Sequence, residues 1–140
     1  MKIGGEISMK ESFFWKDKEK NILKADLFSS IAELHAKEIA STDGDKCNKY
    51  TQIRKFYEEI LPYKTYVPVN ADKEIFERKL PYIKMLNARL AYSAARGHIS
   101  NNCCRFFQEL IKEINAPADL YAFIDFFEAF LAFYKQYKRD

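Results

Sequence analysis

The chain has 140 residues, of which 48% are hydrophobic, 31% charged and 16% aromatic, and its net charge is +3. This length and balance favour one domain with a hydrophobic core, and they argue against both a disordered and a membrane-embedded protein. Four glycines and four prolines are too few for a many-stranded sandwich or barrel, so we predict an all-α protein with long helices and short loops.

The N-terminal part divides into an extension and a first helix. Residues 1–25 form a charged N-terminal extension to which we assign no element, and residues 26–140 are predicted to form a single helical bundle domain. The first helix begins after Asp26, a favourable N-cap, and ends near Ser41, before a turn-rich loop at 41–45. Its predicted buried face consists of Leu27, Phe28, Ile31, Leu34 and Ile39.

The second and third helices are bounded by residues that favour helix ends. The second begins at Thr51 and ends at Pro62, and a looser linker follows. The third begins after Asp72 and runs to Gly97, which is a suitable C-terminal stop. Pro81 lies inside the third helix and should kink or divide it, because proline lacks the N–H donor and clashes with the preceding turn.

The last two helices complete a five-helix bundle with a long, Pro-kinked third helix and an aromatic-rich C-terminal helix. Ser100 caps the fourth helix, and Pro117 suits the first turn of the fifth, which runs from Asp119 to about Lys138. The fifth helix is apolar nearly all round. Such a helix is either central in its bundle or shared with a partner, so self-association stays open.

Basic residues are segregated along the chain. Residues 78–108 contain six lysines and arginines and no acidic residue. Residues 46–57 contain four lysines and arginines and likewise no acidic residue. On a helix with about 100° per residue, one narrow stripe then carries both arginines and tyrosines. The stripe consists of Tyr82, Met85, Arg89, Tyr92 and Arg96. The neighbouring stripe, predicted to face the core, consists of Ile83, Leu86, Leu90 and Ala94.

This stripe has a functional and a structural interpretation. Arginine on a rigid helix holds its donors in a fixed fork that suits phosphate oxygens, and tyrosine stacks on a base or donates to a phosphate. Contacts to the nucleic-acid backbone carry affinity but no sequence information. In the structural interpretation, Arg89 and Arg96 pair with acids on another helix and the aromatics belong to the core.

Three segments carry a family resemblance: Thr51–Tyr57 (TQIRKFY), Leu86–Arg96 (LNARLAYSAAR) and Phe126–Lys135 (FFEAFLAFYK). In this order and spacing they resemble the motifs of the small helical subunit of type III-A (Csm) CRISPR effector complexes, over residues 26–138. The resemblance implies a helical bundle without nuclease activity. It also implies several copies beside the crRNA-bearing backbone subunits, in contact with the target RNA paired with the crRNA.

The predicted RNA-binding residues come from two sources. Those that match basic or aromatic positions of the family pattern are Arg54, Arg89, Arg96 and Tyr92. Those added from the charge pattern alone are Lys49, Lys55 and Lys84. Asn87 departs from the family pattern at a position that is basic in some relatives. The resemblance gives residues 128–135 a structural or subunit-facing role.

Catalytic alternatives lack the residues they need. Helical ribonucleases of similar size use an arginine a short distance before a histidine, and neither His35 nor His98 has one at that spacing. Cys103 or Cys104 near His98 lacks an orienting acid, and adjacent cysteines point to different faces of a helix, unlike zinc ligands. Solvated faces and helix-end electrostatics explain the acidic pairs, which are Glu58–Glu59 and Asp125–Glu128. We predict no catalytic residue, no metal site and no cofactor.

The cellular location follows from the cysteines and the apolar pattern. Three cysteines, two of them adjacent, are a poor basis for a disulfide framework and suggest reduced thiols in the cytosol. The first 25 residues lack the apolar core of a signal peptide. The longest apolar-rich stretch, 123–134, is interrupted by Asp125 and Glu128 and is too short to span a bilayer. We predict a cytoplasmic protein without membrane partners.

Two functions remain open from the sequence. The first is a non-catalytic RNA-binding small subunit of a type III-A complex. It contacts the backbone of the crRNA–target RNA duplex, or single-stranded RNA, without base preference, and it binds other Csm subunits. The alternative is a helical protein–protein adaptor that assembles through its aromatic C-terminal helix and whose basic face is incidental.

Overall fold

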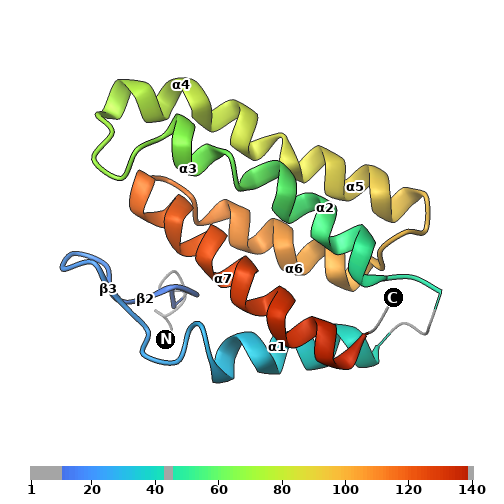
Figure 1. The fold of residues 1–140 in the computed structure, drawn as a ribbon. Helices are drawn as coiled ribbons and strands as arrows, with labels where there is room; N and C mark the ends of the chain where they lie inside the picture. The colour runs from blue at the N-terminus through green and yellow to red at the C-terminus, as the bar shows by residue number, and fades with distance from the viewer. Residues whose placement is uncertain (1–10, 43–45, 139–140) are drawn as a thin grey trace, which may run out of the picture.

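Helices make up most of the protein. The computed structural model describes residues 11–42 and 46–138, so parts of the predicted extension and of the predicted 41–45 loop lie outside the described residues. The elements are β2 (Trp15–Asp17), β3 (Ile22–Leu23), α1 (Ser30–Ser41), α2 (Tyr50–Ile60), α3 (Tyr63–Tyr66), α4 (Lys73–Lys84), α5 (Leu86–Ala95), α6 (Asn101–Lys112) and α7 (Pro117–Tyr137) (Figure 1). The mainly helical class is confirmed, with one small antiparallel sheet that the sequence did not predict.

The five predicted helices correspond to the longer helical segments. The predicted third helix is α4 and α5 together, and α3 is an additional four-residue helix in the predicted linker. The interruption between α4 and α5 falls at Met85, whereas Pro81 lies inside α4. Proline has no N–H to donate to the carbonyl oxygen four residues earlier. Because Pro81 is exposed, water can donate to that carbonyl oxygen instead, and the helix continues.

Several predicted helix ends are confirmed by their hydrogen bonds. The Asp72 carboxylate accepts from the backbone N–H of Ile75 at 2.9 Å, and the Ser100 hydroxyl accepts from the N–H of Cys103 at 3.1 Å. Each bond satisfies one of the donors that the first helical turn leaves without a partner. Pro117 occupies the first turn of α7, as expected.

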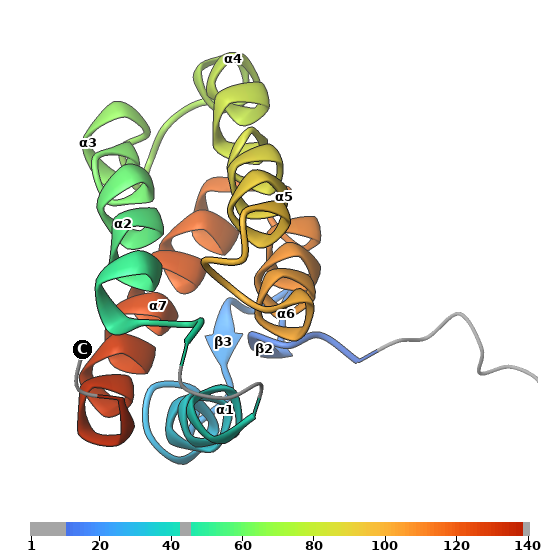
Figure 2. The same ribbon diagram turned by 90° about the vertical axis from the view of Figure 1, so that its right-hand side faces the viewer.

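α7 packs against both α1 and α2 and runs from the middle of the bundle to one edge (Figure 2). Five of its aromatic side chains have no exposed surface: Phe123, Phe126, Phe127, Phe130 and Tyr134. Burial of one phenylalanine side chain stabilises a fold by about 1.5–3 kcal/mol. The apolar surface of α7 is therefore used inside the chain. In the described part of the chain, no helix is both long enough and apolar enough to cross a membrane.

The predicted buried face of the first helix is confirmed only in part: Leu27 and Ile39 are buried and Ile31 packs against the core, but two of the predicted residues are not buried. Ala32, Ala36 and Ile39 are buried, whereas Phe28 and Leu34 are exposed, Leu34 by 55%. The helix begins at Ser30, later than predicted, so Leu27 and Phe28 precede it and do not share its periodicity. The small side chains of the two alanines allow α1 to lie close to the bulky residues of α7, which explains why they form the contact.

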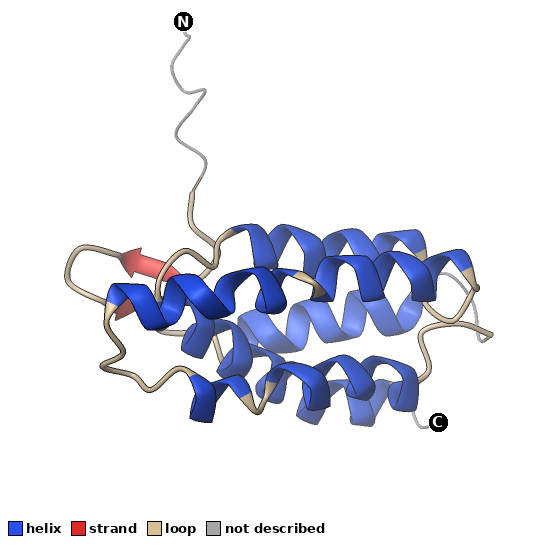
Figure 3. Ribbon diagram, turned by 90° about the horizontal axis from the view of Figure 1, so that it is seen from above, coloured by secondary structure: helices blue, strands red, loops and turns tan. Residues whose placement is uncertain are grey.

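The N-terminal hairpin packs onto the bundle. β2 pairs with β3, and Phe14 and Trp15 are buried in the same core as the helices. The indole N–H of Trp15 donates to the fully buried Asp119 carboxylate at 2.8 Å, and the N–H of Asn115 donates to the same group at 2.9 Å. Seen from above, the helices run lengthwise and the hairpin lies at one end (Figure 3). In the sequence, the aromatic run Phe13-Phe14-Trp15 within the charged extension was the one signal that this segment packs against the core.

Candidate nucleic-acid interface

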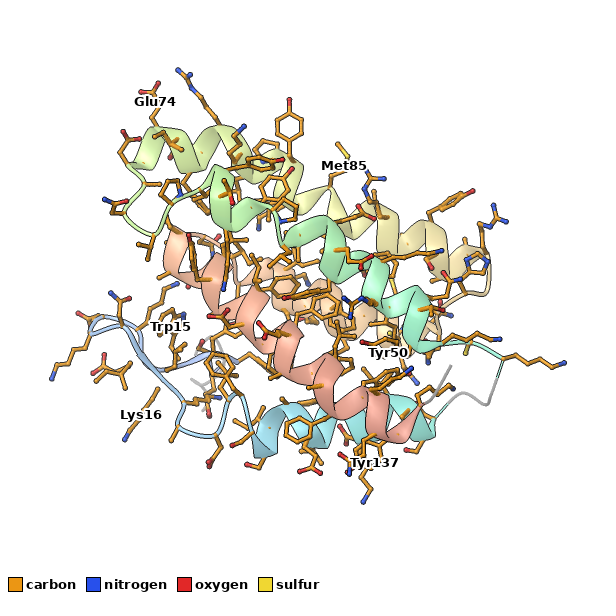
Figure 4. All side chains as sticks on the ribbon, viewed as in Figure 1. Trp15, Lys16, Tyr50, Glu74, Met85 and Tyr137 are labelled. Atoms are coloured by element: carbon orange, nitrogen blue, oxygen red, sulfur yellow. The ribbon has the colours of Figure 1, made fainter. Side chains whose placement is uncertain are left out.

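The predicted stripes on α4 and α5 are confirmed. Tyr82, Met85, Arg89, Tyr92 and Arg96 are all exposed, with Tyr92 exposed by 63%. The neighbouring stripe faces the core: Ile83, Leu86 and Leu90 are buried, and Ala94 is partly buried. Met85 projects outward from the junction of α4 and α5 (Figure 4). The helical period therefore separated the exposed face from the core correctly.

A groove of about 410 Å³ lies between this stripe and α2. Its lining residues come from α2, from the α4–α5 junction, from α5 and from the following loop: Gln52, Lys55, Phe56, Glu59, Met85, Ala88, Arg89, Tyr92, Ser93 and His98. A second hollow of about 200 Å³ continues towards α3 and α4, and Glu59, Met85 and Arg89 line both. Figure 2 shows α2 and α3 on one side and α4 and α5 on the other.

Arg89 has an acidic partner on another helix, as the structural interpretation of the stripe expected. Arg89 Nε lies 2.6 Å from Glu59 Oε2, and the two side chains are 55% and 41% exposed. The partner comes from α2, so the acid-free sequence around Arg89 could not reveal it. Exposed ion pairs contribute about 0–1 kcal/mol, so a phosphate group can compete with Glu59 for Arg89.

Arg54 also has an acidic partner, and it lies away from the groove. Its guanidinium donates to the Glu58 carboxylate and to the Tyr50 hydroxyl, both at 3.0 Å. Lys135 of α7 lies over the ring of Tyr50, 4.5 Å from the centroid. This side of α2 therefore faces the end of α7, and the structure does not bring Arg54 together with Arg89.

Arg96 is the predicted arginine for which the described residues provide no carboxylate. Its guanidinium donates to the Tyr92 hydroxyl at 2.9 Å and lies 5.6 Å from the centroid of the same ring. A cation at the C-terminal end of α5 also interacts favourably with the helix dipole. Arg96 is thus held on the helix surface with donors left for an anion.

The three predicted lysines occupy different places. Lys55 lines the groove opposite Arg89. Lys49 is the exposed N-cap residue of α2, and Lys84 is partly buried at the end of α4; neither lines the groove. The structure therefore brings Lys55, Arg89 and Tyr92 together, with Arg96 beside them.

The ends of α5 and α2 are joined by a buried asparagine that the sequence did not single out. Gly97, at φ 79°, ends α5, and the N–H of His98 donates to the Ser93 carbonyl, as in a Schellman motif. Asn48, at φ 60° and fully buried, donates to the Ser100 hydroxyl at 3.0 Å and accepts from the Ser100 N–H at 2.8 Å. The N–H of Asn48 donates to the His98 carbonyl at 2.9 Å.

The groups considered for catalysis lie in different settings. Cys103 and Cys104 are buried, and burial raises the pKa of the Cys104 thiol, which disfavours the reactive thiolate. Burial lowers the pKa of His35, which packs against Phe106 and lies 3.4 Å from Glu38. In residues 11–42 and 46–138, no group of three or more His, Cys, Asp and Glu residues could hold a metal ion.

Comparison with known proteins identifies the family. The family model described as Csm2 Type III-A matches residues 23–140, which include all the helices from α1 to α7. No curated protein and no solved structure matches the chain. The matched range contains the groove and the exposed stripe described above. The chain therefore belongs to the Csm2 Type III-A family, the small subunit of type III-A CRISPR complexes.

Proposed function

We propose that this subunit binds the backbone of the target RNA paired with the crRNA, without sequence preference and without catalysis, while it contacts other Csm subunits. The observation that carries the proposal is the cationic groove between α2 and α5. Lys55 and Arg89 supply two positive charges in the groove and Arg96 a third beside it, against one negative charge from Glu59. Such a surface attracts a polyanion, and its strength depends on salt.

The stiffness of the site supports backbone contact. Arg89 belongs to α5 and Arg96 caps its C-terminal end, so the spacing of their guanidinium groups is limited by a regular helix. Phosphate contacts position a nucleic acid, while sequence is read at base edges. Arg54, Lys49 and Lys84 remain proposed contacts outside the groove, Arg54 on the family resemblance and the two lysines on the charge pattern.

The absence of catalysis is proposed on chemical grounds. The arginine–histidine spacing of helical ribonucleases is missing from the sequence, and the raised pKa of Cys104 disfavours a thiolate nucleophile. The family is a structural small-subunit family and not a known catalytic one.

The alternative function, a protein–protein adaptor, needs an exposed aromatic surface on the last helix, and most of that surface is buried. Phe130, on which assembly through the last helix would depend, has no exposed surface. Tyr137 is 37% exposed, and its hydroxyl donates to Glu33 at 2.8 Å. The aromatic content of α7 is therefore explained by the core of the chain itself.

The test is the binding of fluorescein-labelled RNA to the Arg96→Ala variant at several salt concentrations. Loss of one phosphate contact should weaken binding of unrelated sequences equally. It should also flatten the slope of log affinity against log salt by about 0.7 for a single strand or 0.9 for a duplex. Arg105→Ala is the matched control, because Arg105 is exposed on α6 and does not line the groove.

The proposed site is wrong if Arg96→Ala and Arg89→Ala both bind RNA like the parent while circular dichroism is unchanged. The same holds if Arg105→Ala weakens binding as much as they do. Binding should also be measured in the assembled complex, where several copies act together.

A further inference from the structure

The part of the groove beside Tyr92 has properties that phosphate binding alone does not require. Phe56, Met85 and Ala88 form an apolar surface there, and Tyr92 stands at its edge with 63% of its side chain exposed. A volume of about 410 Å³ falls within the range of roughly 300–1,000 Å³ that is typical of small-ligand pockets. A phosphate needs donors and gains nothing from apolar walls.

Polar groups also face this hollow. Gln52 and His98 line it. An amide and an imidazole together offer both donors and acceptors, which is what the edge of a nucleobase needs. Their flexible side chains suit several bases equally, so they add no strong base preference.

The charges around the hollow indicate a nucleotide and not an apolar protein side chain. Lys55 and Arg89 lie at its rim, and Arg96 is held against Tyr92 at 2.9 Å. Arg89, paired with Glu59, lines both this hollow and the one that continues from it. An apolar interior under a mainly cationic rim matches a base attached to a ribose phosphate.

We propose that this groove takes one unstacked nucleobase of the bound RNA, stacked on Tyr92, while Lys55 and Arg96 hold the adjoining phosphates. The inference rests on the proposed function and adds a base to its phosphate contacts. Stacking on an aromatic side chain tolerates every base, so the site still lacks sequence preference. The nucleotide must be unpaired or turned out of the duplex, because a stacked base cannot enter a groove.

The test compares two fluorescein-labelled probes of equal length on the full chain, oligouridylate and an abasic ribose–phosphate oligomer. The parent should bind oligouridylate about tenfold more tightly, because stacking is lost in the abasic probe. Both probes should show the same salt slope, because their phosphates are the same. Tyr92→Ala should remove the tenfold preference, and Tyr92→Phe should keep it.

A larger side chain within the groove tests the base pocket without changing Tyr92. Ala88→Leu should remove the preference for oligouridylate, while the matched control Ala91→Leu, on an exposed position of α5 that does not line the groove, should retain it. Equal binding of both probes, with Arg96→Ala still weakening both, overturns the base pocket and leaves the phosphate site. Failure of both probes to bind overturns both proposals. If Ala88→Leu blocks assembly with other Csm subunits but keeps the base preference, the occupant is a protein and the inference is wrong.

Discussion

Arg89 and Arg96 share one stripe but meet different neighbours. Arg89 is paired with Glu59 across the groove, whereas Arg96 rests on Tyr92 of its own helix. A phosphate that approaches Arg89 must displace a carboxylate, and one that approaches Arg96 displaces only water. Arg96 should therefore contribute more than Arg89 to RNA affinity.

The Glu59→Gln variant should bind RNA more tightly than the parent. The change removes the negative charge at the groove and frees Arg89, and an exposed pair worth at most about 1 kcal/mol corresponds to a gain of up to about fivefold. Fluorescence anisotropy measures the effect. Glu109→Gln, which makes the same charge change on α6 beside Lys112, is the control, and an equal gain there would mean that only total charge matters.

His35 should make stability depend on pH. Burial holds its pKa below the ordinary value, so the unfolded chain binds more protons as the pH falls. The free energy of unfolding should therefore be highest above about pH 6.5 and fall as the pH drops through the lowered pKa. Urea denaturation at a series of pH values measures this.

Two variants isolate this histidine. His35→Gln should flatten the dependence, and Glu38→Gln should steepen it, because the Glu38 carboxylate opposes the lowering of the pKa. A parent whose stability does not change between neutral and mildly acidic pH would contradict the assignment.

At the scale of elements, Asn48 holds the starts of α2 and α6 and the C-terminal end of α7 together. Besides its bonds to Ser100 and His98, its carbonyl accepts from the Tyr134 hydroxyl at 2.6 Å. Asn48→Ala should lower the free energy of unfolding by about 3 kcal/mol, because it leaves buried groups unpaired and places alanine in a left-handed conformation. Urea denaturation provides the value.

Asn70→Ala is the matched control for Asn48, because Asn70 is exposed in the loop before α4, and its change should stay within about 0.5 kcal/mol. A loss at Asn48 no larger than this would show that the network does not stabilise the bundle.

At the scale of the whole molecule, the N-terminal hairpin is attached to α7 through one buried carboxylate. Trp15→Phe keeps the ring but removes the donor to Asp119, which should lower the free energy of unfolding by about 1.5–3 kcal/mol, the range for hydrogen bonds to charged groups. Lys18→Met is the control: Lys18 reaches the same carboxylate at 3.3 Å but is half exposed, so the loss should stay below about 1 kcal/mol. Equal losses would mean that charge, and not the indole donor, holds the hairpin.

The sequence by itself determined what depends on neighbouring residues. The five longer helical segments, the caps at Asp72 and Ser100, and the buried stripe of α4 and α5 follow from local hydrogen bonds and a period of 3.6 residues, so these could be predicted, whereas the short α3 and the start of α1 were not. The motifs also indicated the family correctly.

Only the tertiary structure decided which distant residues meet. It paired Arg89 with Glu59, turned Arg54 away from the groove and buried Trp15 against Asp119. It also buried Ala32 and Ala36 of α1 while Leu34 stayed exposed, and it buried the aromatic side chains of α7 inside the chain. Periodicity shows which face of a helix is apolar, but the partner of that face, and of every charge on it, depends on how helices far apart in the sequence pack.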